Sequence, residues 1–420
     1  MMIRRALIVF SILCSTAYAQ VAGKNQVNEW RKQMRQALFI PDPLPKLEVE
    51  NYTTFTPTPG VVAERVSYKT EYGLRVPAIV YRPATQPKGK VPGMVLVNGH
   101  GADKTSWYAY YTAILYAKAG AVVVTYDPIG EGESNDDHQD GVGEHDKKIL
   151  DPPSMPARMG GLMITDIMQA VSYLIQRRDV DSKRIAVLGF SMGSFESALA
   201  GAADPRIHAL LLTGGGDLDG TDGYWDRSAI MCQGGPYHAL AFLGDRGPVL
   251  YTLSARRGVT FILNGTNDTV VDIPNHEQDF FDDLRKRTIA LNGSDRGVFE
   301  TYFDPDASHR PNWMTPTAAT WLEKNLNFPN WSSTPVASLP VEPMRIWAER
   351  VGFTLNKSSA REDRDAGLPL LVAPVPLLTK EQLSILPLAD WQRRKSEFVY
   401  STWVERALTA AKSEFPAAKP

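Results

Sequence analysis

Short apolar segments that alternate with helical patterns constrain the fold of this chain most strongly. The later segments are rich in Val, Ile and Leu, which is typical of strands buried on both faces of a sheet. The stretch 162–177 places its apolar residues on one helical face. This alternation predicts an α/β fold with a mainly parallel eight-stranded sheet and helices on both faces. The predicted strands are residues 61–68, 75–81, 93–98, 121–126, 184–188, 208–212, 260–263 and 298–303.

The segments outside this alternation suggest four parts to the chain. Residues 1–19 have the form of a signal peptide: Arg4 and Arg5, an apolar run, and the small residues Ala17 and Ala19 before the predicted cleavage point. Residues 20–59 form an N-terminal extension with one helix at 27–37, and we expect it to wrap the main body. The remaining parts are a catalytic domain at 60–326 and a C-terminal extension at 327–420, which ends in an amphipathic helix at 389–411.

Composition and charge exclude several classes of protein. The net charge of -2 and the lack of a basic block give no support to a nucleic-acid partner. Cleavage of the signal would leave no membrane span and would place the protein in a secreted or periplasmic location. It would also remove Cys14 and leave Cys232 alone, so we expect no internal disulfide. The sequence leaves the oligomeric state open.

The motif "LGFSMGS" at 188–194 indicates a candidate nucleophile, Ser191. A predicted strand precedes it and an alanine-rich helix follows it, which is the context that gives Gly-x-Ser-x-Gly its meaning. Small flanking residues permit the strained turn that exposes the hydroxyl. Acyl transfer by such a serine needs a histidine base, a carboxylate that holds the imidazole, and amide donors for the oxyanion.

Two downstream segments supply the other residue types. In "FILNGTNDTVVD" a strand and a turn lead to Asp268, and "YFDPDASHRPNW" places His309 in the loop after the last predicted strand. The order Ser191, Asp268, His309 is that of one hydrolase superfamily. Asp217 in "TGGGDLDG", in the loop after the sixth predicted strand, is the alternative acid.

These motifs resemble the α/β-hydrolase superfamily, in its secreted acetyl xylan esterase-like and dienelactone hydrolase-like branch. The segment "VLVNGHGADK" at 95–104 resembles the turn after the third strand whose amide forms half of the oxyanion hole. The resemblance implies that the backbone amides of Ala102, after the turn Gly99, His100 and Gly101, and of Met192 bind the oxyanion. "YDPIGEGES" resembles the Asp-x-x-Gly-x-Gly-x-Ser loop of the family. The chain departs from the deacetylases of this branch where "DPIGEG" replaces Arg-Gly-Gln-Gly and where Ser194 replaces a glycine.

Two long insertions, 130–159 and 214–258, leave the ends of predicted strands and are expected to form the pocket rim. Trp225 and Trp313 are candidates for stacking on a sugar ring, with core packing as the alternative. The acidic stretch 134–146 contains two histidines, but its spacing matches no known metal loop. We therefore expect a solvated charged face there, no metal and no cofactor.

The leading hypothesis is a secreted serine hydrolase that cleaves carboxylic esters of small molecules or glycans through an acyl-enzyme. The resemblance implies O-acyl groups on plant cell-wall glycans as substrates. One alternative is a serine peptidase of the prolyl oligopeptidase type, although the residues before the predicted core are too few for its propeller domain. The other is a catalytically inactive hydrolase-fold protein that binds partners through its C-terminal extension.

Overall fold

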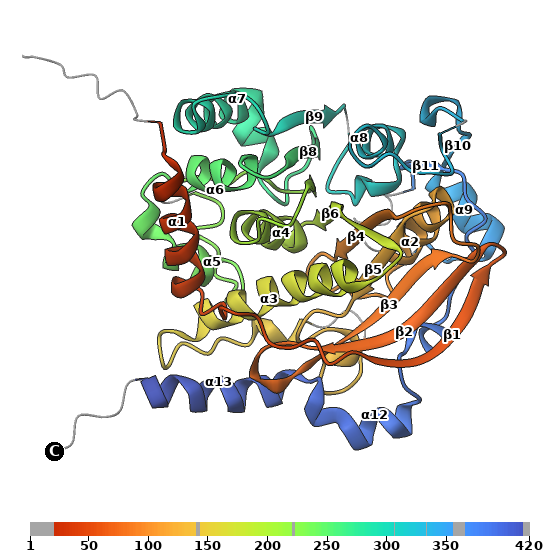
Figure 1. Ribbon diagram of the computed structural model, residues 1–420, viewed down its shortest axis with the longest axis horizontal. Helices are drawn as coiled ribbons and strands as arrows, with labels where there is room; N and C mark the ends of the chain where they lie inside the picture. The colour runs from red at the N-terminus through yellow and green to blue at the C-terminus, as the bar shows by residue number, and fades with distance from the viewer. Residues whose placement is uncertain are drawn as a thin grey trace, which may run out of the picture.

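A nine-stranded sheet forms the centre of the molecule in the computed structural model, which describes residues 21–139, 143–220, 223–305, 307–332, 334–355 and 366–414 (Figure 1). The strand order is β1-β2-β3-β5-β4-β6-β7-β8-β9. The strands are β1 (Glu50–Thr58), β2 (Val61–Lys69), β3 (Arg75–Pro83), β4 (Val91–Val97), β5 (Val122–Tyr126), β6 (Val180–Phe190), β7 (Ala209–Thr213), β8 (Val259–Gly265) and β9 (Glu300–Asp304).

The pairing of the strands confirms the prediction of a mainly parallel sheet. All neighbours from β5 through β4 and β6 to β9 run parallel, whereas β1, β2 and β3 pair antiparallel, and β3 pairs antiparallel with β5. The predicted number of strands was wrong, because β1 lies in the segment expected to be an irregular wrap. This strand is polar and carries Pro57, which an edge strand with one partner tolerates. Its sequence therefore lacks the apolar pattern of the buried strands.

Helices cover both faces of the sheet, as predicted. Alternate side chains of one strand separate into two cores: Leu210 and Leu212 pack with α1, α3, α4, α6 and α7, while Leu211 packs with α2 and α8. The helices of this region are α1 (Lys24–Ala37), α2 (Trp107–Ala119), α3 (Met155–Gln176), α4 (Met192–Ala203), α5 (Gly234–Ala239), α6 (Arg246–Ala255), α7 (Ile273–Asn292) and α8 (Pro316–Leu326).

The C-terminal extension docks onto the sheet domain. Trp347 of α9 is fully buried against Trp107 and Tyr111 of α2, and the Tyr111 hydroxyl donates to Leu371 O at 2.9 Å. The domain boundary at residue 326 stays a prediction. The elements of the extension are β10 (Val341–Pro343), α9 (Met344–Val351), β11 (Pro369–Leu371), α11 (Lys380–Leu383), α12 (Leu388–Arg394) and α13 (Tyr400–Glu414).

The predicted final helix at 389–411 is in fact two helices, α12 and α13, which lie along the lower edge of Figure 1. Two tryptophans explain the break because they are buried in different places. Trp391 of α12 donates from Nε1 to Glu133 O at 2.9 Å, whereas Trp403 of α13 packs among methionines that include Met159 of α3. One straight helix cannot place both rings in this way.

The extension also holds the first insertion through several hydrogen bonds. The Ile385 amide donates to Glu133 Oε2 at 2.9 Å, the Ser401 amide to Asp136 Oδ2 at 3.1 Å, and the Tyr400 hydroxyl to Lys147 O at 3.2 Å. The C-terminal extension therefore contacts the described parts of this insertion, residues 130–139 and 143–149, although Asp137 and Asp146 stay exposed.

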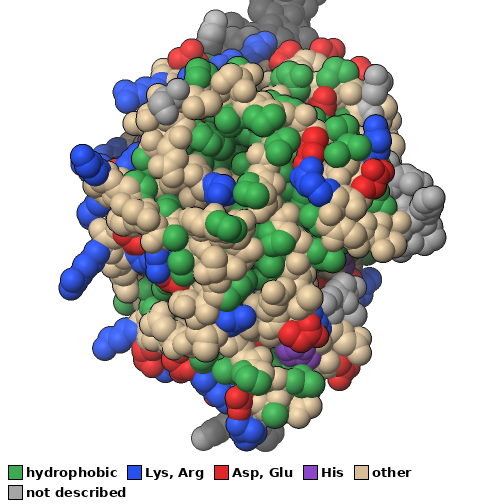
Figure 2. All heavy atoms as spheres, turned by 90° about the vertical axis from the view of Figure 1, so that its right-hand side faces the viewer, with side chains coloured by type: hydrophobic (Ala, Val, Ile, Leu, Met, Phe, Trp, Pro, Cys, Tyr) green, Lys and Arg blue, Asp and Glu red, His purple; other side chains and the backbone are tan. Residues whose placement is uncertain are grey.

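The sequence predicted neither a nucleic-acid partner nor a membrane span, and surface charge and helix hydropathy are the properties that relate to these predictions. On the face shown in Figure 2, acidic and basic side chains are interspersed, and hydrophobic side chains lie scattered between them. Within the described residues, none of the helices combines the length and the hydropathy needed to cross a bilayer. The predicted signal peptide, residues 1–19, lies outside the described residues.

Candidate active site

Ser191 lies in a strained turn between β6 and α4. Its backbone has φ 56° and ψ -120°, a conformation that costs a non-glycine residue energy and recurs at functional sites. The flanking glycines allow this turn to pack closely. A Cβ on Gly189 would lie 2.3 Å from Gly193 O, and a Cβ on Gly193 would lie 2.2 Å from Val97 O. The Gly-x-Ser-x-Gly spacing is thus a steric requirement of this turn.

His309 joins Ser191 to Asp268 through two hydrogen bonds. Its Nε2 lies 2.8 Å from Ser191 Oγ, and its Nδ1 lies 2.8 Å from Asp268 Oδ2. The imidazole and the carboxylate are both buried. An ionised carboxylate only accepts, so Nδ1 carries the proton and Nε2 offers its lone pair to the serine hydroxyl. This geometry suits proton removal from Ser191 Oγ.

Parallel neighbouring strands bring these three residues to one edge of the sheet. Ser191 follows β6, Asp268 follows β8 and His309 follows β9, all at carboxyl ends. The Asp268 Oδ1 atom accepts from the Val270 amide at 3.1 Å, which fixes the carboxylate. The sequence placed all three in loops after strands, and the structure brings their side chains into contact.

Asp217, the alternative acid, belongs to a different group of side chains. Its Oδ1 accepts from Trp225 Nε1 at 3.1 Å, and its Oδ2 lies 3.6 Å from His276 Nδ1. Burial raises the pKa of the Asp217 carboxyl to about 7. Among the two candidate acids, Asp268 is the one that contacts His309.

The amides near Ser191 correct one expectation about the oxyanion hole. Ala102 N–H is already used, since it donates to Gly99 O at 3.1 Å, and Gly101 N–H donates to Glu131 Oε1 at 2.9 Å. Among the described residues, the amides of His100 and Met192 have no acceptor. The expected role of Ala102 is therefore wrong, and His100 supplies the available amide of this turn.

The position of His100 could have been found from the sequence by counting from the strand. The strand β4 ends at Val97, so Asn98 and Gly99 begin the turn and His100 is the next residue. A Cβ on Gly99 would lie 3.2 Å from Ser191 Cβ, which shows how closely the turn approaches the serine.

The two candidate tryptophans are core residues, so the prediction that they stack on substrate was wrong. Trp225 is buried and stacks on Phe195 with ring centroids 4.5 Å apart. Trp313 is also buried and donates from Nε1 to Gly189 O at 3.3 Å. Trp313 thus supports the turn that carries Ser191 without facing a substrate.

The first insertion is only in part the solvated charged face that its composition predicts, because Asp137 and Asp146 are exposed whereas other charged residues are not. Glu133, Glu144 and His145 are all buried. Lys104, itself buried, pairs with Glu133 Oε2 at 2.7 Å and with Asp127. Buried charges need such partners, and the sequence gives no local sign of a lysine so far away in the chain.

Both insertions border one cleft of about 500 Å³, which partly matches the expected pocket rim. Its lining comes from residues 148–157 of the first insertion and 228–239 of the second. Ser191, His309 and Asp268 do not line it. The second insertion also reaches the serine turn, because Cys232 Sγ lies 3.7 Å from Met192 Sδ.

Comparison with known proteins establishes the family. Residues 94–400 match the profile of the Alpha/beta hydrolase family, and the sheet order and the serine turn agree with that assignment. The chain belongs to the α/β-hydrolase family, as the sequence motifs predicted.

Individual relatives are more distant. A protein called Hydrolase ORFZ from Pyricularia oryzae (strain 70-15) is 30% identical over 162 residues, which are 37% of this chain and 33% of that protein. The chain thus spans about a third of the length of this curated relative. The fold is similar to that of Methylesterase BT1017, with 18% identity, a TM-score of 0.56, and coverage of 93% of this chain and 78% of that one. A glucuronoyl esterase from Solibacter usitatus has a TM-score of 0.50 at 14% identity, with coverage of 74% and 95%.

Proposed function

We propose that this protein is a serine hydrolase that cleaves carboxylic esters through an acyl-enzyme. The observation that carries the proposal is the continuous line of hydrogen bonds from Ser191 Oγ through His309 to Asp268, set in a strained turn. The arrangement has the roles of a nucleophile, a general base and an orienting acid. Membership of the α/β-hydrolase family supports this assignment of roles.

The acylation step follows from the positions of these groups. Ser191 Oγ attacks the ester carbonyl carbon while its proton passes to His309 Nε2, and the buried Asp268 carboxylate stabilises the imidazolium. The amides of Met192 and His100 receive the oxyanion. The carbon–oxygen bond to the alcohol then breaks, and the alcohol leaves with the proton held by His309.

Deacylation reverses these roles with water as the nucleophile. His309 takes a proton from water, the hydroxide attacks the acyl carbon, and the bond to Ser191 Oγ breaks as the serine regains its proton. Met192 is the first residue of α4, so the partial positive charge of the helix N-terminus lies beside the developing oxyanion in both steps.

The substrate and the location are further parts of the proposal. Two proteins of similar fold are named as a methylesterase and a glucuronoyl esterase, which supports ester substrates here. We infer an ester on a small molecule or glycan, with O-acyl groups of plant cell-wall glycans as the first class to test. The signal-like residues 1–19 support secretion or export to the periplasm.

A fluorophosphonate probe and an ester panel test this function on the full chain. We expect the probe to label Ser191 and the S191A variant to lose both labelling and turnover. Ser194, which is buried in α4 three residues after Ser191, provides the matched control: S194A should still be labelled. The panel contains acetyl, feruloyl, glucuronoyl methyl and aryl esters together with aminoacyl amides.

Two outcomes would contradict the proposal. Folded protein that stays unlabelled would favour the inactive hydrolase-fold alternative. Faster cleavage of the aminoacyl amides than of every ester would favour a peptidase of the prolyl oligopeptidase type.

A further inference from the structure

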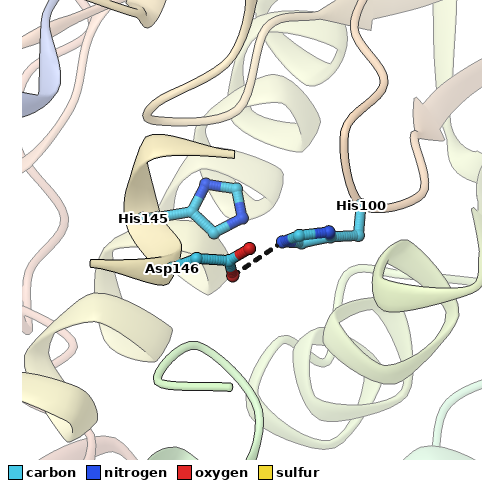
Figure 3. A group of neighbouring side chains, drawn as sticks. All are labelled: His100, His145 and Asp146. Carbon is cyan, nitrogen blue, oxygen red and sulfur yellow. Dashed lines mark hydrogen bonds and ion pairs between the residues drawn. The ribbon is translucent and has the colours of Figure 1, made fainter. Parts of the chain in front are cut away.

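His100, His145 and Asp146 form a group of potential metal ligands beside the serine turn (Figure 3). Their ligand atoms all lie within 4.8 Å of one another. His100 comes from the turn after β4, whereas His145 and Asp146 come from the short helix Glu144–Asp146 in the first insertion. Figure 3 shows the two imidazole rings and the carboxylate turned toward a common point.

The hydrogen bonding of His145 leaves one ring nitrogen prepared for a ligand role. Its Nδ1 lies 2.8 Å from Ile129 O, and because a carbonyl only accepts, Nδ1 carries the proton. The lone pair is therefore on Nε2, which is buried and has no hydrogen-bond partner. Buried polar atoms are rarely left without a partner. A metal-ligating histidine typically donates its other ring N–H to a backbone carbonyl in this manner.

The other side chains of the cluster lie close to His145 and to one another. His100 Nε2 lies 2.8 Å from Asp146 Oδ1, and the two imidazole rings meet edge to face with centroids 5.0 Å apart. Glu131 Oε1 lies 3.8 Å from His145 Nε2. The other carboxyl oxygen of Glu131 is buried and has no hydrogen-bond partner. No lysine or arginine is paired with the carboxylate of Asp146 among the described residues.

Two imidazole nitrogens and a carboxylate are the ligand types that suit Zn²⁺ and similar transition-metal ions, whereas Mg²⁺ and Ca²⁺ prefer oxygen ligands alone. Asp146 has an exposed side chain (44%), so an ion can enter from solvent and keep an open coordination position. We propose that His100 Nε2, His145 Nε2 and the Asp146 carboxylate bind a divalent transition-metal ion, with Zn²⁺ as the ion to test. The ion takes the place of the proton that His100 Nε2 shares with Asp146, and that proton is released to solvent.

Such an ion would join two parts of the chain that are far apart in sequence. It would tie residues 144–146 of the insertion to the turn whose His100 amide is proposed to receive the oxyanion. The side chain of His100 would hold the metal while its backbone N–H stays directed to the reaction. The metal site is therefore a positioning site for the turn, and it stands whether or not the proposed esterase function is correct.

Zinc binding is measured on the chelator-treated full chain by isothermal titration calorimetry and by metal content after dialysis. We expect one Zn²⁺ per chain and a rise in the unfolding temperature that depends on zinc concentration. H145A and D146N should each weaken Zn²⁺ binding by at least tenfold. Asp146 is exposed, so D146N tests the site even where H145A fails to fold.

The matched control is H238Q, because His238 is an exposed histidine that pairs with Asp226 at 3.1 Å elsewhere on the surface. This variant should bind Zn²⁺ as the parent chain does. Replacement by Co²⁺ should give the visible absorption of a tetrahedral site, and D146N should abolish it.

Equal zinc affinity in D146N and the parent chain would overturn the proposal, as would no binding in the parent chain. The S191A variant separates the two proposals. It should keep full zinc binding, so a chain that binds zinc without esterase activity loses only the proposed function, and an active chain without zinc binding loses only the metal site.

Discussion

His309–Asp268 and His100–Asp146 make the same contact in different surroundings. In each pair an imidazole nitrogen lies 2.8 Å from a carboxylate oxygen. The first pair is sealed, with side-chain exposures of 1% and 0%, whereas the second has exposures of 25% and 44%. Interactions between charges strengthen as water is excluded, so burial distinguishes the two pairs where distance does not.

A third pair, His276 and Asp217, lies between these extremes. Asp217 is fully buried, but the closest approach of the two side chains is 3.6 Å, and a second carboxylate, Asp219, lies 3.8 Å from the other ring nitrogen. The three pairs show that a histidine next to an aspartate does not by itself define a role. The role depends on what else the imidazole contacts: a serine hydroxyl for His309, a second carboxylate for His276 and the ring of His145 for His100.

The same change, Asp to Asn, at each pair separates these roles. The largest effect is expected for D268N, because the amide would favour the wrong tautomer of His309 and could not stabilise the imidazolium. Turnover of an aryl ester should fall by about 10⁴. Steady-state kinetics on folded D268N, checked by circular dichroism, measures this loss.

D217N is the matched control for that experiment, since it alters a buried aspartate near the site that does not contact His309. Its turnover should stay within about tenfold of the parent value. A larger loss of turnover in D217N than in D268N would show that Asp217, and not Asp268, is the acid that orients His309.

An intermediate effect is expected on the pH dependence of stability in D217N. Burial raises the pKa of Asp217 to about 7, so between about pH 4 and pH 7 the folded chain holds a proton that the unfolded chain has released. The folded state binds more protons there, and this group therefore makes stability fall as pH rises through that window. The contribution is on the order of a few kcal/mol.

D217N removes this titration, so its free energy of unfolding should depend less steeply on pH between 4 and 7. Urea unfolding at several pH values measures the slope. Identical slopes in the parent chain and D217N would show that Asp217 keeps an ordinary pKa in the folded state.

The smallest effect is expected for D146N in the absence of metal. A solvent-exposed contact of this kind contributes roughly 0 to 1 kcal/mol, so the free energy of unfolding of metal-free D146N should change by less than about 1 kcal/mol. Urea unfolding in the presence of a chelator tests this value. A loss of several kcal/mol would mean that the pair is a buried structural bridge in solution.

The sequence predicted features that depend on local chemistry better than features that depend on distant contacts. The turn around Ser191 was predicted because Gly189 and Gly193 are needed at short range. The polar edge strand β1 was missed because its own sequence lacks an apolar pattern. It is a strand because it pairs with β2. The sequence pointed to the Ala102 amide as an oxyanion donor, but in the structure this amide donates to Gly99 O. That single hydrogen bond leaves the His100 amide as the available donor of the turn.

Burial was the property that the sequence predicted least well. Trp225 and Trp313 are of the residue type that stacks on sugar rings, but both side chains are buried in the core. The charged insertion was expected to be solvated, yet His145 is buried, and Glu133 is buried with Ile385 of the C-terminal extension as a hydrogen-bond partner. A residue-by-residue pattern carries no information about which distant segment will cover it.

The contacts of residues 130–139 and 143–149 with the C-terminal extension have a consequence for how the sequences of related chains can change. Glu133 accepts from the Ile385 amide and Asp136 from the Ser401 amide, so each segment supplies the other's hydrogen-bond partners. A deletion of either segment would break the buried hydrogen bond between the Ile385 amide and Glu133. We therefore expect the first insertion and the C-terminal extension to change in length together among related sequences.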